Sequence, residues 1–249
     1  MKKIKNILVS GNSFTQDGIG GVPPGHGSEG GCSYINQGQG NISEPNNWVG
    51  MLSRKLDIQS LVNMAASSHG NILVADTIRS VIDIHEYPTK NTLVIVTVSI
   101  SERLDVPCVF GHPDASKFVH WDNTLCGHTY LNRFSKTYKK IEKEIGLDII
   151  ADLGYERLDF LFNYLENKGY EYIILLTENE DLNNSSFLRI IKNRNHRLVN
   201  LSPGIGLHDF ATITKHNTVN NYHPDQIGNT MIADQIFNFL TKQYSLETD

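Results

Sequence analysis

The chain has 249 residues, of which 39% are hydrophobic and 20% charged, a composition typical of a folded globular protein and unlike that of a disordered or fibrous one. With 27 acidic and 22 basic side chains, its formal net charge of −5 argues against nucleic acid or an anionic membrane as a partner. The three cysteines are scattered and form no Cys-x-x-Cys pair, which argues against a disulfide framework and favours a reducing compartment.

The sequence shows neither an export signal nor a membrane-spanning segment. The basic N-terminus is followed by only a short apolar stretch, Ile7-Leu8-Val9, which is too brief for the core of a secretory signal. The longest apolar-rich run, residues 93–100, contains Thr97 and Ser99 and is shorter than the roughly 20 residues that a membrane helix needs. We therefore expect a soluble protein of the cytoplasm.

The first half of the chain alternates between short apolar strands and amphipathic helices. Strands are predicted at the apolar runs 4–10, 61–62 and 93–98. Helices are predicted after a cap at Asn46 or Asn47 and again at residues 72–82, because apolar residues recur there at helical spacing. Nine glycines and a Pro-Pro pair between residues 18 and 40 predict a long surface loop.

The second half continues this alternation after an irregular segment. Residues 103–130 contain prolines and glycines without a clear period, so we expect an inserted loop there. Beyond it, the spacing of apolar residues predicts helices at 131–145, around 158–165, at 187–191 and from Pro224-Asp225 onward. Two further strands are predicted at residues 172–177 and 197–201.

Strands that alternate with helices favour a three-layer α/β/α sandwich with a parallel sheet of about five strands. We expect one domain over residues 1–249, with loop insertions at about 16–45 and 103–130. Ligands of such folds bind outside the carboxyl ends of the strands. The turns at 11–13, 67–71 and 99–103 are therefore the places to look for a functional site.

Ser13 lies two residues beyond the first strand, in a glycine-containing turn, where a nucleophile would reach the carboxyl edge of the sheet. A serine hydroxyl is a weak nucleophile until a base takes its proton, so this interpretation requires a histidine at the same edge. Among ten histidines, His223 is the best placed, because it immediately precedes Pro224 and the last predicted helix.

Three segments resemble the sequence blocks of the SGNH (GDSL-type) hydrolases. Residues 7–14 (ILVSGNSF) resemble the block that contains the nucleophile, residues 63–71 (NMAASSHGN) the block whose glycine helps to form the oxyanion hole, and residues 220–224 (NNYHP) the block that contains the histidine. The blocks occur in the order of the family. The Gly-x-Ser-Phe-Thr form, followed by the glycine-rich loop and an Asn-Trp helix, also resembles SGNH-type proteins of tailed bacteriophages, for which association with a virion would be an alternative location.

The resemblance implies a flavodoxin-like SGNH architecture and a serine esterase or deacylase that needs no cofactor or metal. Ser13 would attack an ester carbonyl, His223 would act as the base, and an acyl-enzyme would form. The backbone N–H groups of Ser13 and Gly70 would bind the oxyanion. The expected partner is a small-molecule or carbohydrate ester, and the oligomeric state is left open.

Two positions depart from the family pattern. Ser101 stands where the family has the asparagine of the oxyanion hole, and Asn71 would be its replacement. Asn220 stands where the family has the acid that orients the histidine, and an amide cannot offset the charge of an imidazolium. A Ser-His dyad, or an acid supplied by Asp209 or Asp225, would be an alternative.

Structural roles compete with the functional ones at the predicted oxyanion hole. Gly70 would alternatively be a glycine required only for a positive φ, and Asn71 would alternatively be the N-cap of the helix that follows. The 16–45 loop is also a candidate lid, because of its length and its proximity to Ser13 in the sequence.

Two other functions compete with the esterase. The chain would be a binding or structural protein if Asn220 and Ser101 mark a site that has lost its chemistry. It would be a metal-assisted hydrolase if its loop histidines gathered around an ion, although their spacing matches no zinc motif. The candidate metal-binding residues are His112, Asp114, His120, Asp122, His128, His208, Asp209 and His216.

Overall fold

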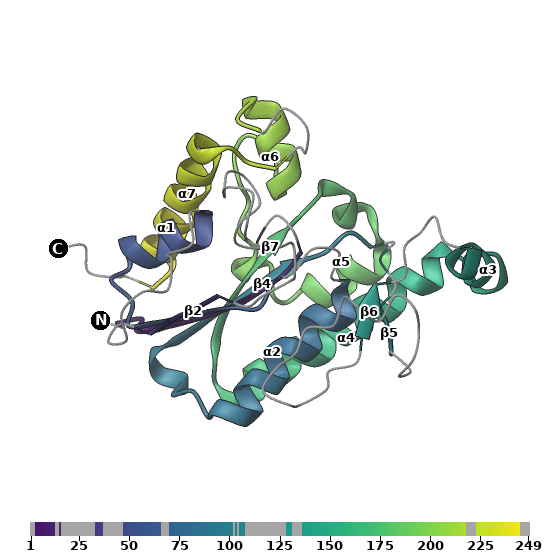
Figure 1. Cartoon of the computed structure of the whole chain (residues 1–249), viewed down its shortest axis with the longest axis horizontal. Helices are drawn as coiled ribbons and strands as arrows, with labels where there is room; N and C mark the ends of the chain where they lie inside the picture. Colours follow the sequence, from purple (N-terminus) through teal and green to yellow (C-terminus); the bar gives the residue numbers. More distant parts are fainter. Residues whose placement is uncertain are drawn as a thin grey trace, which may run out of the picture.

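The computed structural model describes residues 3–12, 15, 33–36, 47–65, 70–101, 103, 105–107, 128–130, 136–217 and 223–244. Within these residues a five-stranded sheet forms the middle of the molecule (Figure 1). In spatial order its strands are β2 (Ser33–Asn36), β3 (Ser60–Asn63), β1 (Asn6–Ser10), β4 (Thr92–Val98) and β7 (Glu171–Leu176). β1 pairs in parallel with β3 and β4, β4 pairs in parallel with β7, and β2 is antiparallel to β3 at the edge.

The order of the four parallel strands determines where a ligand can bind. In chain order they lie second, first, third and fourth across the sheet, which is the order of flavodoxin-like doubly wound folds. The chain moves outward from β1 to β3 and then returns to the other side of β1 to form β4. The topological switch point therefore lies between the carboxyl ends of β1 and β4, where folds of this kind bind their ligands.

Helices cover both faces of the sheet and complete the predicted three-layer α/β/α fold (Figure 1). Successive residues of β1 contribute to two cores, Leu8 to one and Ile7 and Val9 to the other. Every residue of β4 is buried, as a strand covered on both faces requires. The helices of the first layer are α2 (Asn71–His85), α4 (Leu147–Lys168) and α5 (Ser185–Ile191), and those of the second are α1 (Trp48–Lys55), α6 (Leu207–Thr214) and α7 (Gln226–Tyr244).

Most of the predicted strands and helices are confirmed, but the strand at 197–201 is wrong. A short 3₁₀ helix, Asn195–Arg197, occupies its start, and only Leu198 forms a parallel bridge, to Ile174. The ladder ends there because the chain turns back soon afterwards, with the Leu201 N–H bonded to the carbonyl of Ile205. The sheet thus has four parallel strands and one antiparallel strand, not five parallel ones.

Other elements appear where the sequence predicted loops. β2 lies inside the 16–45 segment, and β5 (Asp105–Pro107) and β6 (His128–Tyr130) form an antiparallel pair at the two ends of the 103–130 segment. The rest of both segments falls largely outside the described residues. Helix α6 was not predicted, although its buried Leu207, Phe210 and Ala211 have the spacing of a helix face. None of the helices described is both long enough and apolar enough to cross a membrane.

Asn229 connects α1 to the turn that precedes α7. Its buried side-chain oxygen accepts the Trp48 N–H at 3.0 Å. Its amide nitrogen donates to the carbonyl oxygens of Pro224 at 3.0 Å and Asp225 at 2.9 Å. One side chain therefore satisfies backbone groups of two segments that are far apart in the sequence.

Replacing Asn229 with alanine should destabilise the protein by about 2 kcal/mol or more, because buried backbone groups would lose their partners. Urea unfolding of Asn229→Ala beside the wild type measures this loss. The exposed Asn200→Ala change is the matched control and should stay within about 0.5 kcal/mol. Equal losses in the two variants would contradict the role given to Asn229.

Candidate functional site

Small polar side chains form a buried layer where β1, β4 and β7 end. Asn12, which is fully buried, donates from its amide nitrogen to Thr177 Oγ1 at 2.7 Å and to Ser99 Oγ at 3.4 Å. The Thr177 hydroxyl in turn donates to the carbonyl oxygen of Val98 at 2.7 Å. A buried amide requires such partners, so these bonds hold the turn after β1 against the ends of β4 and β7.

Thr15 is held on the other side of the same turn. Its hydroxyl bonds Thr97 Oγ1 at 3.0 Å, and its carbonyl oxygen accepts from the amide groups of Asn47 at 2.8 Å and Asn63 at 2.9 Å. Gly11 permits this close packing, since a Cβ at that position would lie 2.6 Å from the Cβ of Thr97. Ser13 itself lies outside the described residues, but Asn12 and Thr15, on either side of it, are fixed at the carboxyl edge of the sheet.

Gly70 is the N-cap of α2 and lies against a buried carboxylate. Its N–H donates to Asp105 Oδ1 at 2.9 Å, and the N–H of Leu73, one helical turn on, donates to Asp105 Oδ2 at 2.8 Å. The backbone of Gly70 has a φ of −89°, so a positive φ is not the reason for this glycine. The reason is space, because a Cβ here would lie 2.7 Å from the Arg103 carbonyl oxygen and from the Asp105 carboxylate.

Asp105 is thus a residue of the site region that sequence reasoning missed. It lies in the segment expected to be an irregular loop, and no fixed spacing connects it to Gly70. Its carboxylate occupies the positive end of α2, where an anion is favoured. The Gly70 N–H that the family resemblance assigns to the oxyanion hole therefore already has an anionic partner, and it would have to leave Asp105 to bind a substrate oxyanion.

Asn71 connects α2 to the end of β4. Its side-chain oxygen accepts the Ser99 N–H at 2.7 Å, and its amide nitrogen donates to the Ser99 carbonyl oxygen at 3.3 Å. Gly154 of α4 lies close by, because a Cβ there would be 3.1 Å from the Cβ of Asn71. The alternative in which Asn71 caps the helix is wrong, since Gly70 holds that position. A contribution of Asn71 to an oxyanion hole stays a prediction.

Ser101 shares a polar cluster with Tyr155 and Asp181. The buried Tyr155 hydroxyl donates to Asp181 Oδ1, and it is also hydrogen-bonded to Ser101. Burial and the charge of Asp181 raise the pKa of Tyr155 far above its ordinary value, so the phenol keeps its proton. Tyr155 and Asp181 are therefore neighbours of the predicted site that the sequence did not indicate, since α4 and the segment after β7 carry no motif.

His223 lies in a turn fixed at its base, directly before the buried Pro224. Pro224 forms an antiparallel bridge with Asn217, and the Asp225 N–H donates to the carbonyl of His216 at 3.0 Å. Asn220, the predicted orienting residue, lies outside the described residues. The backbone directly after His223 is thus anchored at the start of α7, and the role of His223 as a base stays a prediction.

The two acids considered as substitutes for Asn220 have partners of their own. Asp225 accepts the Gly228 N–H at 2.7 Å with one oxygen, and its other oxygen lies 3.4 Å from His216 Nδ1. Asp209 accepts the Asn179 N–H at 2.8 Å. Asp225 therefore holds the start of α7, and Asp209, in the first turn of α6, holds the segment that follows β7.

The structure describes only some of the residues of the predicted histidine-based metal site. That part holds no group of three or more His, Cys, Asp or Glu side chains arranged to bind an ion. His112 and His120, together with Asp114 and Asp122, lie outside the described residues, so that hypothesis stays a prediction.

No protein-family model matches the chain, and no curated protein does. Among solved structures, LAE5, an alpha/beta hydrolase enzyme from the metagenome of Lake Arreo in Spain, is 13% identical, with a TM-score of 0.53 over 100% of this chain and 99% of that one. The psychrotrophic esterase EstA from Pseudoalteromonas sp. is 12% identical (TM-score 0.49, 97% and 100% covered). The lipase Lip_vut3 from a goat rumen metagenome is 14% identical (TM-score 0.47, 94% and 97% covered). At these identities the likeness to LAE5 shows the fold alone.

The buried carboxyl of Asp105 should make stability depend on pH. Burial raises the pKa of Asp105 from 3.8 to about 6, while the N–H groups of Leu73 and Gly70 oppose the rise. Between these values the folded chain binds more protons than the unfolded one, so the contribution of Asp105 to stability is present at low pH and lost as the pH rises. We expect the wild type to gain up to about 3 kcal/mol relative to Asp105→Asn between about pH 7 and pH 4.

Urea unfolding of both proteins across that range measures the difference. The exposed Asp57→Asn change is the control, and its difference from the wild type should vary by less than about 0.5 kcal/mol. A difference between the wild type and Asp105→Asn that does not change with pH would show that burial leaves the ionisation of Asp105 unaltered.

Proposed function

We propose that this chain is a serine-dependent ester hydrolase of the SGNH type, with Ser13 as nucleophile and His223 as general base. The observation that carries the proposal is the anchored turn between Asn12 and Thr15, which lies at the topological switch point of the sheet. Buried hydrogen bonds fix both sides of Ser13 there. The fold shared with LAE5 is consistent with this chemistry.

The reaction would pass through an acyl-enzyme. Ser13 Oγ would attack the ester carbonyl carbon while His223 takes the hydroxyl proton, and the protonated imidazole would return that proton to the leaving alcohol. Water would then attack the acyl-enzyme with the same assistance, releasing the acid and regenerating Ser13. Each half-reaction thus ends with the protons balanced and needs no cofactor.

The oxyanion would bind to backbone N–H groups at the start of α2 and in the Ser13 turn. The Gly70 N–H becomes available only if the Asp105 carboxylate gives it up, so substrate would compete with an internal anion. The hydroxyl of Ser101 would be a third donor only on leaving Tyr155, because Tyr155 donates to Asp181 and therefore accepts the single Ser101 proton. An acyl group on a carbohydrate, or another small ester, is the substrate class that we propose.

A binding protein that keeps this fold is the second candidate. It is favoured by one observation of the structure, the occupation of the Gly70 N–H by Asp105, in addition to Asn220 and Ser101 at positions where the family has other residues. In that case the Gly70 N–H would stabilise the fold through Asp105 and would not bind a reacting ester.

Incubation with a fluorophosphonate should attach one probe molecule to the wild type and none to Ser13→Ala or His223→Ala, because phosphonylation needs both the nucleophile and its base. Intact-protein mass spectrometry counts the adducts. The exposed Ser202→Ala and His196→Ala changes are the matched controls and should leave labelling unaltered. Absence of an adduct on the folded wild type would favour the binding protein, and labelling that survives Ser13→Ala would place the nucleophile elsewhere.

Restoring a carboxylate at position 220 should raise ester turnover, because an acid stabilises the imidazolium and its reactive tautomer. The reverse change in a serine protease lowers kcat about 10⁴-fold, so a gain of at least about tenfold is expected for Asn220→Asp with p-nitrophenyl acetate. Asn217→Asp adds the same charge three positions earlier in the chain and should have little effect. If the wild type is inactive and Asn220→Asp gains activity, the geometry of the site is retained and only the acid is missing. If turnover does not rise, residue 220 does not orient His223.

A further inference from the structure

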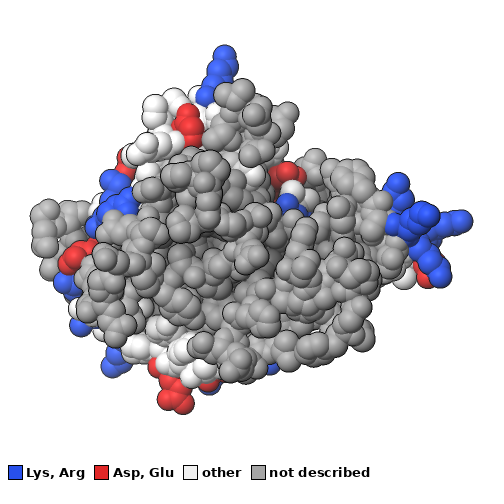
Figure 2. Space-filling model, in the orientation of Figure 1, with Lys and Arg blue, Asp and Glu red and all other residues white. Residues whose placement is uncertain are grey.

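Helix α3 (Lys136–Ile145) lies at one end of the molecule and extends away from the sheet (Figure 1). It is followed directly by α4, after a turn at Gly146 with a φ of +84°. Figure 2 shows a cluster of blue side chains at this end, the densest in that view. The rest of the visible charge in the figure is scattered and of both signs.

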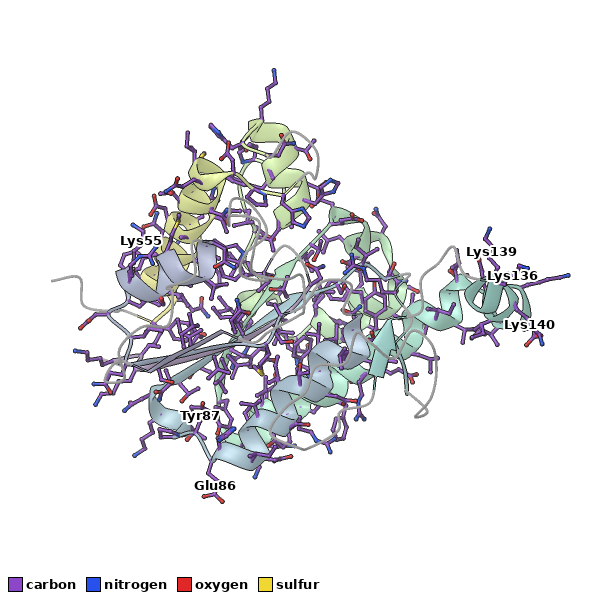
Figure 3. All side chains as sticks on the ribbon, in the orientation of Figure 1. Lys55, Glu86, Tyr87, Lys136, Lys139 and Lys140 are labelled. Atoms are coloured by element: carbon purple, nitrogen blue, oxygen red, sulfur yellow. The ribbon has the colours of Figure 1, made fainter. Side chains whose placement is uncertain are left out.

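Four lysines form one face of α3. Lys136, Lys139, Lys140 and Lys143 are spaced by three and four residues, which places them on the same side of a helix. All four are exposed, and Figure 3 shows Lys136, Lys139 and Lys140 pointing away from the body. Lys140 lies 3.9 Å from Glu144, whereas in the described part of the chain Lys136, Lys139 and Lys143 form no ion pair.

Lys55, on another part of the molecule, differs from the α3 lysines because it lies 2.6 Å from Asp234 of α7. Within α3 the four lysines outnumber the two glutamates, so the lysine face of this helix is positive on a chain whose net charge is −5, while Asp148 and Asp152 follow on α4. The overall charge, which predicted no anionic partner, does not describe this surface.

Exposed aliphatic side chains continue from α3 into α4. Ile145, Leu147, Ile149 and Leu153 retain 37%, 36%, 50% and 43% of their accessible surface. A single exposed leucine is ordinary, but Ile149 and Leu153 are four positions apart and so form an exposed aliphatic patch on one side of α4. On α3 itself, the partly buried Ile141 and the exposed Ile145 lie opposite the lysines, so the helix is amphipathic.

We propose that α3 and the first two turns of α4 form a docking surface for an anionic lipid bilayer. A helix with lysines on one face and aliphatic residues on the other suits the boundary between headgroups and acyl chains, where the lysine stems can extend to the headgroups. Each lysine near an anionic surface contributes additional attraction. Flexible ammonium groups require charge density and no fixed geometry, which favours a lipid surface over a shaped protein partner.

The experiment is sedimentation with large vesicles of phosphatidylcholine that contain about 30% phosphatidylglycerol, compared with vesicles of phosphatidylcholine alone. We expect the full chain to pellet with the anionic vesicles in about 50 mM salt and to be released in about 300 mM salt, because salt screens the attraction. The doubly substituted K139E/K140E should bind at least about tenfold more weakly.

Two matched variants separate charge from apolar contact. K90E/K242E makes the same change in net charge at exposed lysines elsewhere, and it should bind like the wild type. Ile149→Gln combined with Leu153→Gln should also weaken binding, because it removes apolar surface that would be buried in the bilayer. Salt should alter this factor little, since no charge changes. All of these positions are exposed, so circular dichroism should show an unchanged fold in each variant.

The proposal is overturned if the protein does not pellet with anionic vesicles, if it pellets equally with neutral ones, or if K90E/K242E weakens binding as much as K139E/K140E. It is also overturned if light scattering shows a dimer that the Ile149→Gln and Leu153→Gln changes dissociate, because the patch would then join two copies of the chain. Ser13→Ala should bind vesicles like the wild type, so the result is independent of the proposed hydrolase activity.

Discussion

The buried amide of Asn12 is the interaction on which the carboxyl edge of this sheet depends. An amide without exposure to water must find partners within the protein, and here those partners belong to the ends of β4 and β7. The turn after β1 is thereby fixed relative to two other strands at once. Thr15 completes the arrangement, because its carbonyl oxygen is shared by Asn47 and Asn63.

The start of α2 carries a buried charge that stabilises the helix and would oppose the proposed reaction. A helix N-terminus favours an anion, and Asp105 supplies one from a segment that is 35 residues further along the chain. In a hydrolase of the proposed type, the substrate oxyanion would need the same Gly70 N–H. In that case the strength of the Asp105 contact would set how readily the site accepts a reacting ester, and a contact too strong to break would favour the binding protein.

The net charge of this protein does not describe how charged side chains are distributed over its surface. Acidic side chains predominate over the whole chain, yet α3 concentrates lysines at an end of the molecule where aliphatic residues are also exposed (Figure 2). Carboxylates of the body are engaged in local roles, such as Asp225 at the start of α7 and Asp76 with Arg157. A net charge alone consequently gives a poor description of the surfaces that a partner would meet.

The sequence by itself determined the three-layer fold, the approximate bounds of most strands and helices, and the strand ends at which a site would lie. These features follow from local periodicity and turn residues, as in β4 and in the Asn47 cap of α1. The sequence did not indicate the single bridge at Leu198, the cluster of Ser101 with Tyr155 and Asp181, or the carboxylate on Gly70. Only the tertiary structure decided these contacts, because they join residues far apart in the chain, such as Gly70 and Asp105, and such a contact leaves no periodic pattern in the sequence.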